Sequence, residues 1–158
     1  MFFKKAKMKK EENKKPENVT TYNAVFGELE YIDCAWEGYS VSSLFGEEKT
    51  IDMYVYADED EKIIEAAQEK VYQNYLRYRI EIEEAVRKVI FREFVLPYDF
   101  DLTSRFRVSS VIVTEGGICG LAIVDNTYDM GHNRFKFVVE TEPDYEFTDS
   151  EEYFIETK

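Results

Sequence analysis

The hydrophobic period of this chain changes near residue 58 and again after residue 94, and these two changes most constrain its fold. Between them, apolar residues recur every three or four positions, the period of a helix that lies against a core. On either side, apolar and polar residues alternate, the period of strands with one buried face. The pattern predicts an α+β fold, an antiparallel sheet of about five to seven strands covered on one face by a long helix or a pair of helices inserted between the N- and C-terminal strands.

The helical block has a well-marked start and end. Asp58 or Asp60 is expected to cap its first turn, and Pro97 ends the run. A break near 77–80 would give two helices folded back on each other, and one continuous helix stays an open alternative. Its apolar stripe consists of Ile64, Ala67, Val71, Tyr75, Tyr78, Ile82, Val86 and Val89. We expect Glu81, Glu83 and Glu84 to form a solvated face of the helix.

The flanking segments predict the strands. Residues 21–33 are expected to form one strand with a bend at Gly27, and 35–58 a hairpin whose turn is 45–49. Residues 105–117 should end in a Gly-Gly turn, and the nearly all-apolar 118–125 should form a central strand buried on both faces. Residues 134–142 alternate again, and for the acidic end an edge strand and a short helix both stay open.

Charge divides the chain more sharply than its length does. Its 158 residues suffice for one core, and we expect a disordered basic arm at 1–18, a single domain at 19–147 and an acidic tail at 148–158. Seven Lys and three Glu give the arm a net charge of +4. Because the whole chain carries −13, the remaining residues carry −17. A body this acidic repels nucleic-acid backbones and favours a basic partner.

Compartment and membrane association are predicted from the same composition. Cys34 and Cys119 lie in apolar surroundings and are expected to be buried thiols in the reducing cytoplasm. No stretch approaches the length of a membrane span, and Phe2, Phe3 and the arm's lysines would give only marginal, reversible surface binding. We therefore expect no stable membrane association.

The stretch GLAIVDNTYDMGH, residues 120–132, invites a chemical interpretation. Asp125 and Asp129 stand four apart, and His132, the single histidine, follows three later. One histidine excludes the common multi-histidine metal sites, although an oxygen-rich Ca²⁺ or Mg²⁺ loop stays open. Asn, Thr and Gly are turn formers, so we expect these side chains to brace a polar turn between two strands by accepting backbone hydrogen bonds. No cofactor is predicted.

Trp36 and Tyr39 are the candidate partner-binding residues. We expect the single indole to anchor the core or a sheet face, and the alternative is an exposed hot spot, since Trp and Tyr are enriched in such centres.

Several short pieces together resemble a family of small bacterial proteins of unknown function. They are FGELEY (26–31), WEG (36–38), FGEE (45–48), AQEKVYQNYL (67–76) and GLAIVDNTYDMGH (120–132). In that family's hairpin pattern, Asp125, Asp129 and His132 occupy the Asp, Asp and His places. Met130-Gly131 departs from it, because the family has Glu before the His. The resemblance implies a fold and an association with small acidic immunity proteins that pair with toxins.

Neither a nucleophile elbow nor a phosphate-binding loop occurs in the chain. The leading hypothesis is therefore a non-enzymatic protein-binding module, an immunity-like inhibitor of a basic partner. The alternative is a metal-binding protein or metal-dependent enzyme that uses Asp125, Asp129 and His132.

Overall fold

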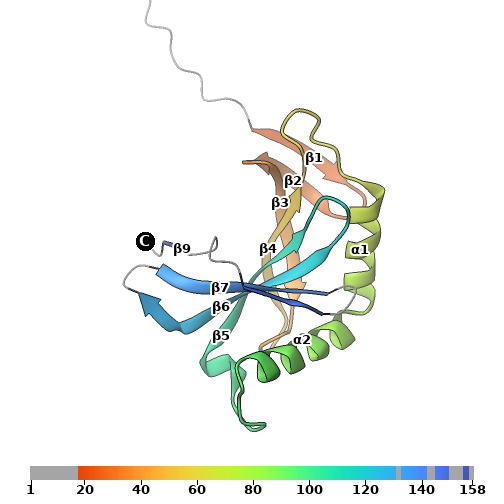
Figure 1. Cartoon of the computed structure of the whole chain (residues 1–158). Helices are drawn as coiled ribbons and strands as arrows, with labels where there is room; N and C mark the ends of the chain where they lie inside the picture. The colour runs from red at the N-terminus through yellow and green to blue at the C-terminus, as the bar shows by residue number, and fades with distance from the viewer. Residues whose placement is uncertain (1–17, 131–132, 142–144, 150–154, 157–158) are drawn as a thin grey trace, which may run out of the picture.

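The computed structural model describes residues 18–130, 133–141, 145–149 and 155–156, so the predicted arm lies outside the described residues except for Asn18. In these ranges the chain is an α+β structure (Figure 1). Its elements, in chain order, are β1 Val19–Asn23, β2 Gly27–Ile32, β3 Ala35–Ser42, β4 Lys49–Tyr56, α1 Ala66–Arg77, α2 Arg79–Glu93, the 3-10 turn η1 Leu102–Ser104, β5 Phe106–Val113, β6 Cys119–Met130, β7 Asn133–Glu140, β8 Phe147–Asp149 and β9 Ile155–Glu156.

The sheet is mixed, and this corrects the prediction of an antiparallel sheet of five to seven strands. Strands β1 to β8 lie side by side in chain order, and β9 pairs with β7. Every pair is antiparallel except β4–β5, which is parallel. The helices cause this exception, because a strand that follows a helical crossover returns in the direction of the strand before it. Strand β1 was not predicted as a separate strand, whereas the short strands β8 and β9 lie in the acidic end, where an edge strand was one of the two open alternatives.

The segment expected to be one bent strand is a hairpin. The Asn23 side chain accepts hydrogen bonds from the backbone N–H groups of Val25 and Phe26 at 2.8 and 3.0 Å, and thereby reverses the chain. Gly27 completes the turn at φ +81°, a conformation that glycine adopts without a steric penalty. The β3–β4 hairpin was predicted correctly, with Ser42 opposite Lys49 at its end.

The helical block is two helices, and it begins later than predicted. The Asp58 carboxylate accepts from the N–H groups of Asp60 and Glu61 and so caps a separate turn. Helix α1 starts only after Glu65, whose N–H donates to the Gln68 side chain at 2.9 Å, as in one half of a capping box. Tyr78, at φ −111° and ψ 23°, breaks the block into two helices.

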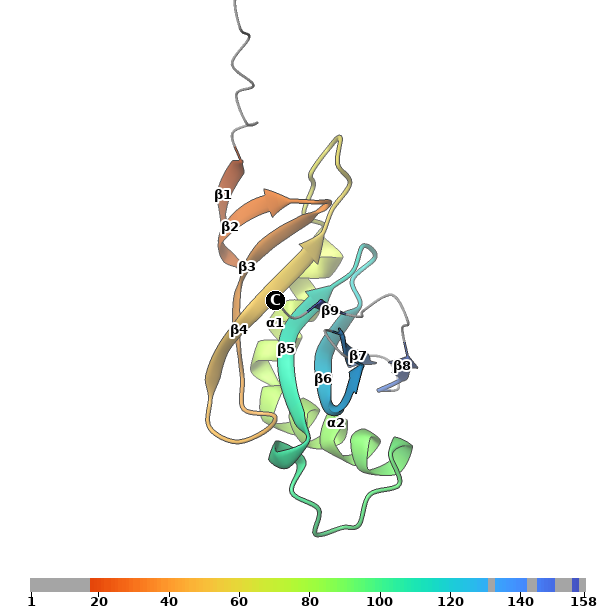
Figure 2. The same cartoon turned by 90° about the vertical axis from the view of Figure 1, so that its left-hand side faces the viewer.

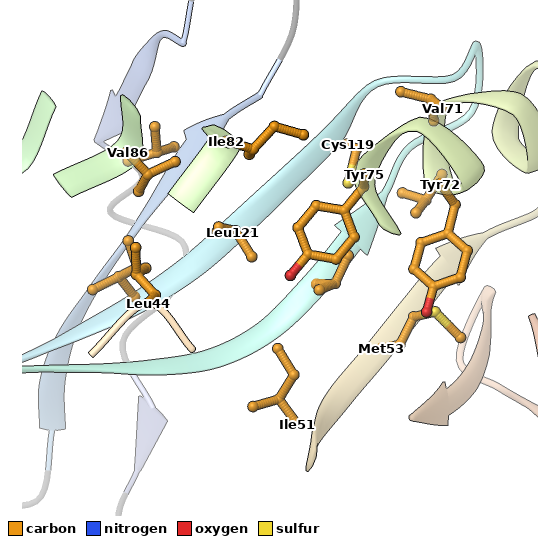
Figure 3. Packing of buried hydrophobic residues seen from close by; sticks show 14 of the residues in the cluster. Leu44, Ile51, Met53, Val71, Tyr72, Tyr75, Ile82, Val86, Cys119 and Leu121 are labelled. Atoms are coloured by element: carbon orange, nitrogen blue, oxygen red, sulfur yellow. The ribbon is translucent and has the colours of Figure 1, made fainter. Parts of the chain in front are cut away.

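Both helices lie on one side of the sheet in both views (Figures 1 and 2). Buried residues of the helices share one hydrophobic cluster with residues of the strands. Tyr72 and Tyr75 point from α1 onto the strands, Tyr72 toward Met53 of β4 (Figure 3). On the other face, Ile112, Ala122 and Val138 form a second small cluster, so β6 is buried on both faces as predicted. Among the described residues, no helix has the length and apolar character that crossing a membrane requires.

Candidate functional site

The face of the sheet turned away from the helices carries a row of acids on three neighbouring strands. In β2, Glu28 and Glu30 alternate with Leu29, which is 3% exposed in the core. Because successive side chains of a strand point to opposite faces, both glutamates lie on the open side. In the same way, Glu37 follows the buried Trp36 in β3, and Asp52 lies between the buried Ile51 and Met53 in β4.

These acids line a hollow of about 190 Å³. Two tyrosines, Tyr39 of β3 and Tyr54 of β4, complete its polar wall. We call the surface made by these six residues the acidic face: Glu28, Glu30, Glu37, Asp52, Tyr39 and Tyr54. Tyr39 is 72% exposed, so its ring is available for contact.

Strand register places like charges opposite each other on the acidic face. Glu30 lies directly across from Glu37, and Glu37 lies across from Tyr54. A directly opposed pair of like charges destabilises a sheet. The pKa of Glu37 is raised above its ordinary value, first by burial and then by the charges of Asp52, Asp33 and Glu30. Burial, followed by the Asp52 and Glu37 charges, raises the pKa of Tyr54.

The chemistry of the acidic face suits a cationic group. Carboxylates accept hydrogen bonds from guanidinium and ammonium groups, and tyrosine rings attract cations over their faces. No group of three or more His, Cys, Asp or Glu in the described ranges is arranged to hold a metal ion. The acidic face can therefore accept the cationic head group of a Lys or Arg side chain.

Asp125, the first residue of the predicted metal set, is committed to protein contacts. It is fully buried and accepts from Arg105, with Nη2 at 2.9 Å and Nε at 3.1 Å. It also accepts from the N–H of Thr127 at 2.9 Å, the local backbone bond expected of a bracing aspartate. The Arg105 guanidinium lies over the rings of Phe94 and Phe106, 4.8 and 5.0 Å from their centroids.

The stretch 120–132 is mostly strand, which corrects the prediction of a polar turn. Strand β6 runs to Met130 and contains Asn126 and Thr127, and the register with β7 shifts between Asp125 and Asp129. Asn126 and Thr127 fall in this irregular part of the ladder, because Asp125 lies opposite Phe135 and the next paired residue of β6 is Asp129, opposite Arg134. The backbone of Asp129 thus lies in β6, whereas its side chain and the whole of His132 fall outside what the structure describes.

The two candidate partner residues have opposite environments. Trp36 is 5% exposed, its Nε1 donates to the carbonyl of Lys62 at 3.0 Å, and its ring meets Tyr31 edge-on at 5.2 Å. This is the core anchor that we preferred from the sequence, and a buried indole offers no contact surface. Tyr39, three positions later, lies exposed on the acidic face and remains a candidate partner-binding residue.

Two further sequence predictions about polar groups were wrong. Cys34 is exposed, because it occupies a two-residue turn between Ile32 and Ala35 with Asp33, both at positive φ. Glu83 is 1% exposed, where a solvated face was expected. It accepts hydrogen bonds from Ser42 and Ser43 at the end of β3, contacts that lie some forty residues away in the sequence.

The acidic face itself was missed as a site. The available signal was the alternation of acids with core residues in GELEYI, AWEGYS and IDMYVY. Alternation shows that each acid leaves the core, but only the pairing of β2, β3 and β4 brings them together. No protein-family model, curated protein or solved structure matches this chain. The resemblance to the small bacterial family, and the immunity-like role that it implies, stay predictions.

Proposed function

We propose that this chain is a non-enzymatic protein-binding module whose acidic face takes Lys or Arg side chains of a basic partner. The observation that supports this most directly is the hollow lined by Glu28, Glu30, Glu37 and Asp52 beside an exposed Tyr39. Complementary charge speeds the encounter of two proteins and selects among partners. A toxin enzyme blocked by such a module is one form of the proposal.

The like-charge pair of Glu30 and Glu37 also supports the proposal. Two like charges at opposed positions of neighbouring strands cost stability in the free protein, and a cation placed between the two carboxylates would relieve that cost. The partner would thus gain both the new attraction and the loss of the repulsion. The alternative use of Asp125 as a metal ligand gains no support from this arrangement, since Arg105 already occupies its carboxylate.

The test compares two doubly substituted variants of equal net charge. Glu30→Gln with Glu37→Gln removes two charges from the acidic face, whereas Glu81→Gln with Glu115→Gln removes two exposed charges from α2 and from the β5–β6 turn. An Arg-rich probe peptide is titrated against each by calorimetry at low and at high salt. We expect at least a tenfold loss of affinity for the face variant and much less for the control.

Equal losses in the two variants would contradict the proposal, because they would show that net charge alone attracts the peptide. A poly-Glu peptide titrated against the unsubstituted protein is the charge control for the probe, and it should not bind. Co-purification at low salt should then recover a basic partner that high salt releases. We place this function in the cytoplasm, and the exposed Cys34 thiol is compatible with a reducing compartment.

A further inference from the structure

The parallel pairing of β4 with β5 stops halfway along both strands. Its register runs from Asp52 opposite Ser110 to Val55 opposite Val113. The first residues of β4, from Lys49, pair only with β3, and the first residues of β5, from Phe106, pair only with β6. Figure 2 shows the two strands close together near their ends and farther apart toward their starts.

A β-bulge explains where the pairing stops. In the β5–β6 ladder, Val108 faces Ile123 and Ser110 faces Ala122, so Ser109 is an extra residue. Such a residue bends its strand and ends regular pairing, and bulges are common beside binding sites. The bend at Ser109 therefore turns the start of β5 away from β4.

The space left between the two strands is a groove of about 510 Å³, which lies within the usual range of ligand pockets. Residues of β4 form one side, residues of β5 form the other, and the β3–β4 loop closes part of it. We call it the β4–β5 groove. Its lining comprises Ser42, Phe45, Glu47, Lys49, Thr50, Ile51, Asp52, Thr103, Phe106, Arg107, Val108, Ser109 and Asn126.

The two sides of the groove have different character. On the helix side, Ile51 and Phe106 belong to the core cluster, and Val108 packs against it. By strand alternation, Thr50, Asp52 and Arg107 face the open side. The charged lining residues include two cations and two anions, so the groove lacks the one-sided charge of the acidic face.

Two strand edges that face each other across a groove match the hydrogen-bonding pattern of a further strand. An added strand gains affinity from main-chain hydrogen bonds, and alternate pockets read its side chains. We infer that the β4–β5 groove binds an extended peptide segment of another protein, with apolar residues toward the half-buried Phe45 and Val108 and polar residues toward Asp52 and Arg107. The two charges of that polar side, one of each sign, favour a segment of low net charge, unlike the basic partner of the acidic face.

The experiment uses a displayed library of random ten-residue peptides, selected on the whole protein at high salt to suppress charge binding. Enriched peptides should alternate apolar and polar residues. A proline at the centre of an enriched peptide should weaken binding at least tenfold, because it removes a donor and distorts the strand. Amide resonances of Thr50, Val108 and Ser109 should shift on binding.

Thr50→Trp fills the groove from an exposed position of β4, and Thr21→Trp makes the same change on exposed β1, outside the groove. Enriched peptides should lose at least tenfold in affinity for the first variant and keep their affinity for the second. Deletion of Ser109 is a second way to close the groove. It removes the bulge that separates the starts of β4 and β5, and it leaves Val108 and Ser110 on their present faces.

Absence of any enriched peptide, or equal binding to Thr50→Trp and the unsubstituted protein, would overturn the inference. Peptides that depend on Glu30 and Glu37 but not on Thr50 would support the proposed function and equally overturn the groove. The two proposals thus fail separately.

Discussion

Val95 ends α2 in a conformation that a β-branched residue rarely adopts. Its φ is 50°, and its side chain is 87% exposed. The N–H of Val95 donates to the carbonyl of Arg92 at 3.3 Å, and that of Leu96 donates to the carbonyl of Phe91 at 3.0 Å. These two bonds form a Schellman motif, in which this position is usually glycine.

Val95→Gly should therefore stabilise the protein. A Cβ in the left-handed region costs about 1–2 kcal/mol, and the glycine variant is free of this cost. The greater freedom of glycine in the unfolded chain cancels part of this stabilisation. Few contacts are lost, because the valine side chain is exposed. We expect the free energy of unfolding to rise by about 1 kcal/mol in urea denaturation. Val95→Ala keeps the Cβ and is the control. A lower stability for the glycine variant than for the alanine variant would contradict this account.

The Arg105–Asp125 pair gives a second prediction at the residue scale. Arg105→Met leaves a fully buried carboxylate without its cation, which should cost about 3–5 kcal/mol. Adding Asp125→Leu removes that charge and should recover much of the loss, as urea denaturation of the single and double variants would measure. If the double variant is as unstable as the sum of the two single changes, the pair does not act as a unit.

Single residues also show what the sequence could predict. That Asp125 accepts a hydrogen bond from a nearby backbone N–H follows from its type, because the Thr127 partner is two residues away. Its pairing with Arg105 depends on β5 lying beside β6 and could not be predicted. The fate of Glu83 is similar, since a carboxylate on a helix surface is normally solvated and only the distant β3–β4 loop buries it.

Between elements, Glu83 fastens α2 to the β3–β4 loop. Its carboxylate accepts from the Ser43 N–H and hydroxyl, both at 2.9 Å, and from the Ser42 hydroxyl at 3.2 Å. Arg87 of the same helix donates to the carbonyl of Leu44 at 2.9 Å. These contacts hold the loop that carries Phe45, which forms part of the wall of the β4–β5 groove.

Glu83→Ala should thus loosen one loop as well as lower global stability. Hydrogen bonds to a buried charged group contribute about 1.5–3 kcal/mol, so we expect a loss of roughly 3 kcal/mol. Hydrogen exchange should speed up most at Ser43 and Leu44. Glu84→Ala, an exposed neighbour, is the matched control and should change little. Unchanged exchange at Ser43 in the Glu83 variant would refute the anchoring role.

Elements were easier to predict than their arrangement. Local periodicity indicated the β3–β4 hairpin, the strands after the helices and the helical block. It could not indicate that β4 and β5 pair in parallel, because that depends on the path of the chain through both helices. The start of α1 was misplaced because the acids at 58–61 stabilise a turn as readily as a first helical turn.

For the molecule as a whole, the acidic face makes stability depend on pH. The pKa of Glu37 is higher in the folded protein than its ordinary value, so the folded state holds this proton more tightly. That advantage is complete below the unfolded pKa, which is about 4.3 for Glu, and it is lost as the pH rises through the higher folded pKa.

Glu37→Gln should remove this pH dependence. At pH 7 the variant should be more stable by a few tenths to about 1 kcal/mol, since it no longer places a charge in a partly buried position, nor one beside Asp52 and Glu30. At pH 3.5 the two proteins should have nearly equal stability, because Glu37 is then protonated. Thermal unfolding at both pH values measures this. A stabilisation of the same size at both would contradict the charge explanation.

The tight turn between β2 and β3 has a practical consequence for these experiments. It exposes Cys34, whereas Cys119 is buried among the strands. A thiol reagent should therefore titrate one group in the native protein and two after denaturation. A maleimide fluorophore coupled at Cys34 would stand beside Asp33, whose charge already reaches Glu37, and its emission would report when a cation docks.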